Sequence, residues 1–471
     1  MIEINTEHHE YKARHALWKQ YRDLYTGGAQ FKAQAGEYLV QRNREPVGVY
    51  QERLNRAFYE NYIGSIVDWY AATLFRREPV ISVDGDNEIG RKFFNSFVED
   101  CDRKGSKISD FFRRQILEAL ICGSSYTLVD FPLQHQKLQN RAEEEAVGAA
   151  NAYLVSYAPD ELINWSTNER GEFDWVVIRT SQMRRQRLED AEPMLETNWH
   201  YYDREKFRSY RQISKPGMFG TGSDARPIEL VAEGLHGLAR QKRVPLFELK
   251  LSDGMWLMNK AASLQLEHFN KSNALGWALT MGLFATPVIY SDKSWNQIIG
   301  ESYYIQMGPE DKFGWAEPEG HVYEIASKNL DRLKEEIYRV CYLLAQAGQT
   351  SADGRTISGL SKQRDFAITQ EVLRSFGDTV KDAMQRVLRA VEQAREDDLS
   401  IGVSGLDEFD IGDFSAEIDD ARRLLELGVG SPTLRRQIYK KLAFKYLCDE
   451  RQDLKDTIAR EIDEWMTREK R

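Results

Sequence analysis

The residues of this 471-residue chain that could carry out chemistry are few, and their spacing matches no common active site. A phosphate-binding loop of the G-x-x-x-x-G-K-[ST] type is absent. The run from Gly217 to Gly222 is rich in glycine but does not open a helix pattern, so it predicts a flexible turn. Ser124-Ser125 follows Gly123, yet the G-x-S-x-G pattern of a nucleophile turn is also absent. We therefore predict no catalytic residue and no enzymatic activity.

Metal-ligand spacing is equally hard to find among the histidines, cysteines and acidic residues. His8-His9 reads as a flexible N-terminus, and His268 as a hydrogen-bonded residue on the inner face of a helix. The acidic runs Glu143–Glu145 and Glu396–Asp398 are typical of solvated helix ends or loops rather than cation sites. The four cysteines are far apart and fit reduced, buried thiols. We expect no metal and no cofactor.

The bulk composition is that of a globular protein, with 42% hydrophobic and 29% charged residues. No run approaches 18 apolar residues, so we predict no membrane span, and the polar start of the chain predicts no export signal. The net charge of −10 argues against tight, nonspecific nucleic-acid binding, but not against contact with DNA that must slide. The 22 Tyr and 10 Trp favour large packing or assembly surfaces.

Apolar periodicity predicts an α+β, mainly helical fold. We expect helices at 9–25, 47–75, 88–102 and 108–122, and β structure from 152 to 251. Residues 133–150 look like an exposed insertion. Helical patterns return at 254–284 and 327–347, and between them lies a compact segment of short strands. Both ends of that segment then emerge at one tip of an antiparallel helix pair.

A polar break separates the last of these helices from a very long one. An apolar stripe ends at Gly348, and Gln349–Thr356 is polar, without periodicity, with Gly354 at its tip. From about residue 358 the helical pattern runs for over thirty residues, roughly 50 Å at 1.5 Å per residue. Gly377 lies inside it and costs about 1 kcal/mol relative to Ala, so we predict a bend there.

Small residues on the helix at 254–284 leave two interpretations open. They could pack laterally against other copies of the chain, or lie within an intramolecular bundle. The residues are Ala261, Ala262, Ser263, Ser272, Ala274 and Gly276.

Taken in order along nearly the whole chain, several loose motifs resemble the portal proteins of tailed bacteriophages. The motifs are Tyr38-Leu39, Tyr50–Phe58 with Asn61, Leu74–Pro79, Gly123–Tyr126, Val244–Phe247 and His268–Pro287. The insertion at 133–150 is a departure that the resemblance does not explain.

The resemblance implies a dodecameric ring with a central channel at one capsid vertex, through which double-stranded DNA is packaged and ejected. Its partners would be further copies of the chain, the major capsid protein, the large terminase subunit and a head-completion or adaptor protein. It would be made in the bacterial host cytoplasm and reside in the virion. The implied segments are the wing (1–253), stem helices (254–284 and 327–347), clip (285–326), channel loop (348–357), long wing helix with edge strands (358–414) and helical crown (415–471).

The site residues that follow from the resemblance form three groups. The DNA-facing channel loop would be Gln349, Thr350, Ser351, Asp353, Gly354, Arg355 and Thr356, with hinges at Gly348 and Gly377. The clip, which would dock terminase or adaptor, would present Tyr290, Trp295, Tyr303, Tyr304 and Trp315. Two other classes stay open: another structural protein of a phage head, such as a minor capsid protein, and a helical hydrolase with its site in 152–251.

Overall fold

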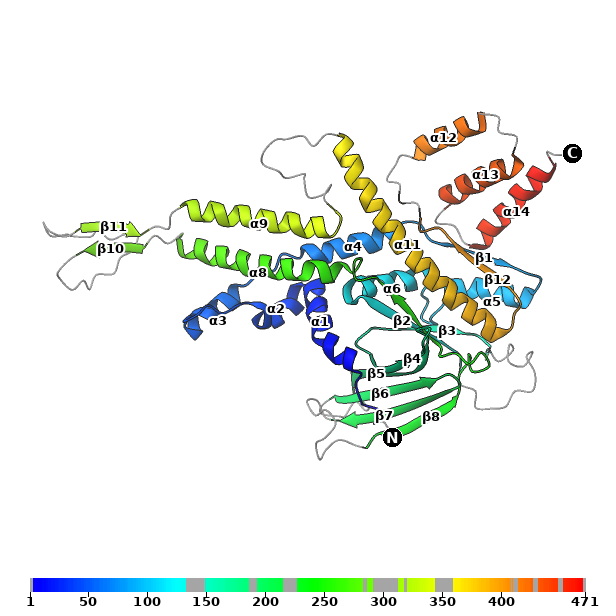
Figure 1. Ribbon diagram of the computed structural model, residues 1–471, viewed down its shortest axis with the longest axis horizontal. Helices are drawn as coiled ribbons and strands as arrows, with labels where there is room; N and C mark the ends of the chain where they lie inside the picture. Colours follow the sequence, from blue (N-terminus) through cyan, green and yellow to red (C-terminus); the bar gives the residue numbers. More distant parts are fainter. Residues whose placement is uncertain are drawn as a thin grey trace. The chain divides into compact units, whose positions relative to one another are not determined.

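The computed structural model describes residues 3–132, 148, 150–185, 193–214, 227–282, 286–290, 312–316, 320–343, 359–407, 409, 414–426, 431–447 and 452–468. The fold is mixed α+β and mainly helical, as the sequence predicts (Figure 1). The chain divides into two compact units. Unit 1 comprises Met1–Arg22, Ile66–Asn259 and Gln363–Arg471, and unit 2 comprises Asp23–Ser65 and Lys260–Lys362. Within the described ranges no helix is long and apolar enough to cross a membrane.

The first half of the chain is helical before it turns to strands. Its helices are α1 (His9–Thr26), α2 (Gly28–Tyr38), α3 (Val47–Arg56), α4 (Tyr62–Leu74), α5 (Glu88–Glu99) and α6 (Ile108–Cys122). The single helix expected over 47–75 is wrong, because the chain leaves the helix at Ala57 and starts again at Tyr62. Asn61 starts the second helix, since its Oδ1 accepts the Gly64 amide at 2.8 Å, as an N-cap does.

Two antiparallel sheets form the core of unit 1. One has the order β3-β2-β9, from β2 (Ser124–Asp130), β3 (Tyr153–Tyr157) and β9 (Leu246–Lys250). The other is a meander of β4 (Leu162–Thr167), β5 (Phe173–Arg184), β6 (Met194–Asp203), β7 (Lys206–Ser214) and β8 (Glu229–Leu235). One buried cluster joins Leu128 and Leu246 of the first sheet to Val176, Ile178 and Tyr202 of the second. Burial of each such side chain stabilises the fold by about 1.5–3 kcal/mol.

The remaining elements complete both units. In unit 1, β1 (Val80–Asp84) pairs antiparallel with β12 (Ser400–Ser404), and the C-terminal helices are α12 (Phe414–Glu426), α13 (Pro432–Tyr446) and α14 (Gln452–Arg468). Unit 2 contains β10 (Thr286–Tyr290), β11 (Lys312–Ala316) and α9 (Gly320–Val340). Two long helices, α8 (Leu257–Gly282) and α11 (Gly359–Arg395), contain positions where the chain passes between the units.

Candidate functional site

The helix pair α8 and α9 is one antiparallel hairpin with β10 and β11 at its end (Figure 1). Near its base the Lys260 ammonium donates to the Tyr342 hydroxyl at 2.5 Å. Further along, Lys271 Nζ donates to Asn329 Oδ1 at 3.0 Å, and the Tyr323 hydroxyl donates to the Ala278 carbonyl at 3.3 Å.

The strands at the tip keep this register. Thr286 pairs with Ala316, and Tyr290 pairs with Lys312. Residue partners therefore follow one antiparallel alignment from the base of the helices to the strands, as the sequence predicts for a segment held at one tip.

Among the expected clip residues, Tyr290 has a side chain that the structure describes. It closes the described part of β10 and is 66% exposed. Trp315 lies on β11 opposite Pro287, but its side chain is outside the described residues, as are Trp295, Tyr303 and Tyr304.

Helix α9 starts and ends earlier than the expected 327–347. It begins at Gly320 and ends at Val340. Tyr342 adopts a left-handed conformation (φ 62°), and the Leu343 amide donates to the Tyr338 carbonyl at 2.9 Å, which closes the helix end. Helix α9 ends early because Tyr342 adopts the left-handed conformation that terminates it, a role that the sequence predicts for Gly348. Gly348 and the channel-loop residues Gln349–Thr356 lie outside the described residues.

Amide side chains of α8 hold the backbone of the segment from Tyr38 to Ile63. Gln265 accepts from the Ile63 amide at 3.2 Å and donates to the Glu60 carbonyl at 2.7 Å. Asn270 accepts from the Val40 amide at 2.8 Å and donates to the Tyr38 carbonyl at 3.1 Å. Asn273 bonds both the amide and the carbonyl of Phe58, at 3.0 and 2.9 Å. Sequence periodicity missed these contacts, because it follows apolar residues.

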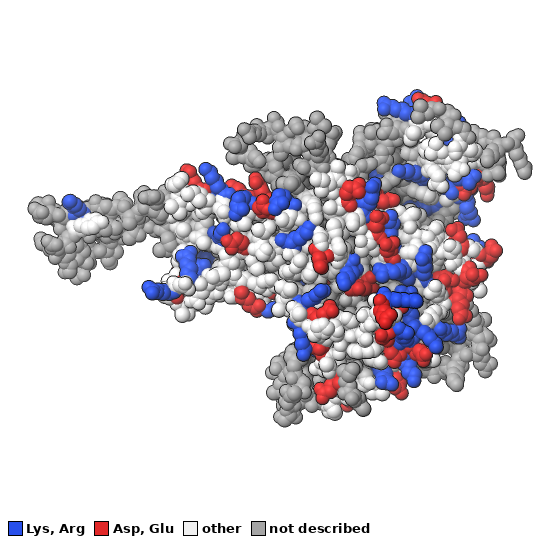
Figure 2. All heavy atoms as spheres, viewed as in Figure 1, with Lys and Arg blue, Asp and Glu red and all other residues white. Residues whose placement is uncertain are grey.

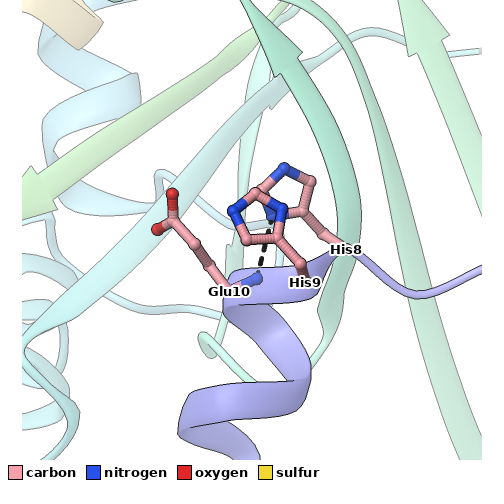
Figure 3. Close-up of side chains that lie close together, drawn as sticks. All are labelled: His8, His9 and Glu10. Atoms are coloured by element: carbon pink, nitrogen blue, oxygen red, sulfur yellow. Dashed lines mark hydrogen bonds between the residues drawn. The ribbon is translucent and has the colours of Figure 1, made fainter.

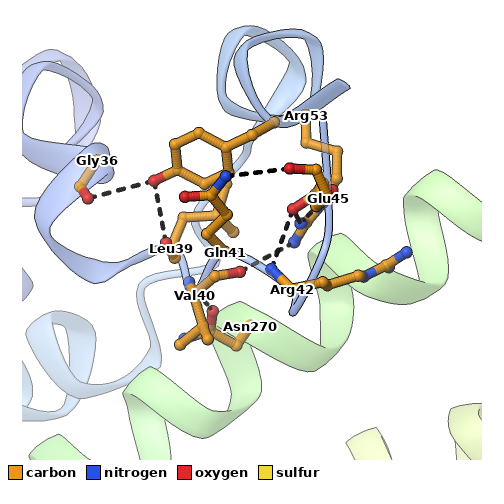
Figure 4. A network of polar contacts seen from close by, with 9 residues as sticks. Gly36, Leu39, Val40, Gln41, Arg42, Glu45, Arg53 and Asn270 are labelled. Atoms are coloured by element: carbon orange, nitrogen blue, oxygen red, sulfur yellow. Dashed lines mark hydrogen bonds and ion pairs between the residues drawn. The ribbon is translucent and has the colours of Figure 1, made fainter. Parts of the chain in front are cut away.

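The loop held by Asn270 has its own polar network (Figure 4). Arg53 Nη1 donates to both carboxylate oxygens of Glu45, at 2.8 and 2.7 Å, and both side chains are almost fully buried. This hydrogen bonding lowers the pKa of Glu45. The Tyr50 hydroxyl lies within hydrogen-bond distance of the Gly36 and Leu39 carbonyls. Much of the motif Tyr50–Phe58 therefore serves to fix this loop on α8.

Most of the small residues of α8 face other parts of the same chain. Ala261, Ala262 and Ser272 are at most 5% exposed, and the ring of Phe58 lies against Gly276. Ser263 is exposed. Of the two interpretations left open by the sequence, packing within the chain therefore applies to this face of α8.

His268 is buried on α8, as the sequence predicts, but it is not fully hydrogen-bonded. Its Nε2 lies 3.6 Å from Glu60 Oε2, and its Nδ1 has no hydrogen-bond partner within the described ranges. Burial lowers the pKa of His268. The ring contacts Tyr62 edge-on, with centroids 5.0 Å apart. The His268 ring therefore lies beside Glu60 and the first residue of α4.

The acidic run Glu396–Asp398 is only partly solvated, contrary to the expectation for it. Asp397 is buried and accepts from Arg395 Nε at 2.6 Å, with neither side chain exposed. The Arg395 guanidinium also lies 3.7 Å from the Phe93 ring centroid. Glu396 pairs with Arg240 at the surface. The other acidic run, Glu143–Glu145, and the Gly217–Gly222 turn lie outside the described residues.

His8, His9 and Glu10 are a described group that could hold a metal ion, with ligand atoms within 4.8 Å of one another (Figure 3). The His8 ring stacks on Trp165 with centroids 4.1 Å apart, and its Nδ1 accepts the Glu10 amide at 3.3 Å. That hydrogen bond favours the tautomer with a proton on Nε2, which must be lost before Nε2 can bind a metal. We infer an anchored N-terminus rather than a metal centre.

Within the part of the chain that the structure describes, His200 and Ser209 of the five-stranded sheet have the residue types of a catalytic pair. His200 Nδ1 lies 3.0 Å from Ser209 Oγ across β6 and β7, and burial lowers the pKa of His200. Among the described residues no carboxylate hydrogen-bonds to this histidine to orient it. Ser125 is a buried residue of β2 rather than a nucleophile turn.

Comparisons with known proteins give weak structural likeness only. No family model and no curated protein matches the chain. A chain of a solved structure described as "Neck of empty GTA particle computed with C6 symmetry" is similar at 12% identity and TM-score 0.43, covering 78% of this chain and 86% of that one. A chain of "Virion of native gene transfer agent (GTA) particle" is similar at 12% identity and TM-score 0.41, covering 84% and 93%.

Proposed function

We propose that this chain is a portal subunit, twelve copies of which form a ring around a channel for double-stranded DNA. The observation that carries the proposal is the single antiparallel register of the α8–α9 hairpin, from Lys260 and Tyr342 at its base to Tyr290 and Lys312 at its strand tip. The resemblance to portal proteins, which rests on the order of motifs in the sequence, predicts a stem and clip in this part of the chain. In the proposed ring α8 and α9 form the stem, and the tip carrying Tyr290 and Trp315 docks terminase or adaptor.

The channel loop of the proposed ring is residues 348–357, between the end of α9 and the start of α11. Its short polar side chains and the glycines Gly348 and Gly354 suit a segment that moves with DNA. Arg355, balanced by Asp353, would touch phosphates transiently.

Charge also suits a channel through which DNA slides. On the face drawn in Figure 2, Lys and Arg are interspersed with Asp and Glu, and the chain carries a net charge of −10. Every phosphate that a protein neutralises adds affinity, so an acidic wall keeps friction low. In this proposal a separate terminase hydrolyses ATP, and the ring sits at one vertex of the virion, in contact with the major capsid protein.

Electron microscopy and mass photometry of the purified full chain test the proposal. We expect rings with a central channel and a mass near that of twelve 54.6-kDa chains. A stable monomer at micromolar concentration contradicts it. Nuclease or ATPase activity from this chain alone would favour the enzyme alternative instead.

A further inference from the structure

Within unit 1, the loop that precedes β9 lies along one face of α11. Arg240 pairs with Glu396 at 2.7 Å, and Gln241 Nε2 donates to the Gln393 carbonyl at 2.8 Å. As the loop advances, its contacts on the helix therefore step back toward the N-terminus of α11. Residues 396, 393, 389 and 386 follow one another at steps of three and four, so they share one face of the helix.

Two arginines meet where this loop enters β9. Arg386 of α11 donates through Nη2 to the Glu248 carbonyl at 2.8 Å and through Nε to the Asp382 carbonyl at 3.3 Å. The Arg243 guanidinium lies 4.7 Å from the centroid of the buried Phe247 ring. Because Phe247 and Glu248 are consecutive residues of β9, both guanidinium groups lie at the same part of this strand. Arg389 is exposed one turn further along the same face of α11.

The two charges of this arginine pair act on each other. Burial lowers the pKa of Arg243, the carboxylate of Glu172 opposes the shift, and the positive charge of Arg386 adds to it. Both residues stay protonated at neutral pH, as arginine does in proteins. Like charges that a fold holds close together are stabilised when an anion lies between or beside them.

No such anion is supplied by the part of the chain that the structure describes. There, no carboxylate forms an ion pair with Arg243, Arg386 or Arg389. The acidic side chains nearby are engaged by other groups: Glu396 by Arg240, Glu392 by the Leu399 amide and Glu172 by Asn168. In a chain with a net charge of −10, these three arginines are therefore a local surplus of positive charge.

We propose that Arg243, Arg386 and Arg389 form a binding site for phosphate groups, either free phosphate or the backbone of a nucleic acid. Arginine forks that are held in place by a ring and by backbone carbonyls lose little freedom on binding. One carboxylate is matched by one bidentate arginine, whereas the oxygens of a phosphate accept from several forks at once. The proposal does not rest on the portal assignment, because all three residues belong to one unit of a single chain.

Neutralising substitutions in the full chain test the site. The variants are Arg389→Gln, Arg243→Gln and the two combined. Arg386 is left unchanged, because its guanidinium also holds the backbone of β9. The matched control is Arg91→Gln with Lys92→Gln, two exposed residues of α5 in the same unit, which changes the net charge by the same amount as the double variant. Thermal melts verify that every variant folds.

Fluorescence anisotropy of a short labelled DNA duplex, measured over a range of salt concentrations, tests the nucleic-acid source. Each single substitution should weaken binding at low salt about fivefold and reduce the slope of log K against log salt by about one. The double variant should lose about two in this slope, and the control should bind like the unmodified chain. The loss should be the same for duplexes of different sequence, because phosphates carry no sequence information.

Inorganic phosphate tests the free ion as the source. Compared with chloride at equal ionic strength, it should raise the melting temperature of the unmodified chain and the control, but not that of the double variant. Protection by phosphate without binding of the duplex assigns the site to free phosphate. Binding of the duplex that the double variant loses assigns it to a nucleic-acid backbone. Either result supports the proposal.

Other results overturn it. If the double variant responds to both probes as the control does, or if neither probe acts on the unmodified chain, these arginines do not bind phosphate. If a polyglutamate peptide binds and the double variant loses that binding, while both phosphate probes fail, the surface docks an acidic protein segment instead. In each of these cases the ring expected for a portal subunit can still form, so the portal assignment is judged separately.

Discussion

The backbone carbonyl oxygen of Leu406 lies so close to Gly377 that a Cβ atom added to this glycine would stand 1.8 Å from it. The approach is possible because Gly405 and Leu406 both have positive φ, 94° and 58°, which turns the chain onto α11 after β12. Helix α11 runs from Gly359 to Arg395 and passes through Gly377 without a break. The close contact with the Leu406 carbonyl explains why glycine stands at position 377. The bend predicted there from the sequence stays a prediction.

Substitution Gly377→Ala should therefore destabilise unit 1, by about 2 kcal/mol or more, because the Leu406 loop must move away from α11. The matched control is Gly48→Ala in α3, where a Cβ meets nothing within 4 Å. There alanine should be neutral or stabilising by up to about 1 kcal/mol, as its helix propensity predicts. Urea unfolding measures both. Equal stability of the two variants would contradict the close approach.

The Asp397–Arg395 pair should be costly to break. Asp397→Leu alone leaves the Arg395 guanidinium buried without its carboxylate, which typically costs about 3–5 kcal/mol. Replacing both residues, as in Arg395→Met with Asp397→Leu, should cost much less, because no uncompensated charge remains. A double-mutant cycle from denaturant unfolding separates these terms. If the double variant is as unstable as the two single changes added together, the pair is not coupled.

The region from Val47 to Phe75 shows what the sequence could and could not predict. Its apolar spacing correctly indicated helix, but the break at Ala57–Asn61 depends on the Asn61 cap and on backbone bonds to Asn273, which join residues over 200 positions apart. The burial of polar groups also depends on contacts between residues far apart in the sequence. Asp397 reads as solvated because its neighbours are charged, and only the tertiary contact with Arg395 and Phe93 explains its burial.

The strands were predicted better than the site. The β structure expected from 152 to 251 contains the strands β3 to β9. Of the expected site residues, Tyr290, Trp315 and Gly377 fall within the described elements, and their roles stay predictions. Nothing in local periodicity could have indicated the amide contacts of Gln265, Asn270 and Asn273.

Loss of the Asn270 side chain should loosen the loop between α2 and α3. In Asn270→Ala the Val40 amide and the Tyr38 carbonyl lose their partners, at a cost of about 1–2 kcal/mol. Hydrogen exchange should become faster at the Val40 amide in particular. The control is Ser263→Ala, an exposed position on the same helix. Unchanged exchange at Val40 would mean that the loop is held by Arg53 and Tyr50 instead.

Stability should fall on acidification, in part through His268. Burial lowers the pKa of this imidazole, Glu60 and Asp331 oppose the shift, and Lys334 adds to it. A lowered pKa means that the unfolded chain takes up the proton more readily, so the contribution is complete above about pH 6.5 and is lost as the pH falls toward the folded-state pKa. His268→Gln should flatten the dependence of melting temperature on pH in this range. His321→Gln, at an exposed residue of α9, should not.

Deletion of Gln349–Thr356 tests the part of the portal proposal that concerns DNA. The deletion falls between the closed end of α9 at Leu343 and the start of α11 at Gly359, so the hydrogen bonds that end α9 are retained. If these residues contact DNA in a channel, rings should form as before, while packaging or retention of DNA in particles fails. Gly354→Ala with Arg355→Gln keeps the loop length and should give a milder defect, because it reduces only flexibility and phosphate contact. A deletion variant that no longer assembles would show instead that the loop is a structural contact between copies, and the channel assignment would then be wrong.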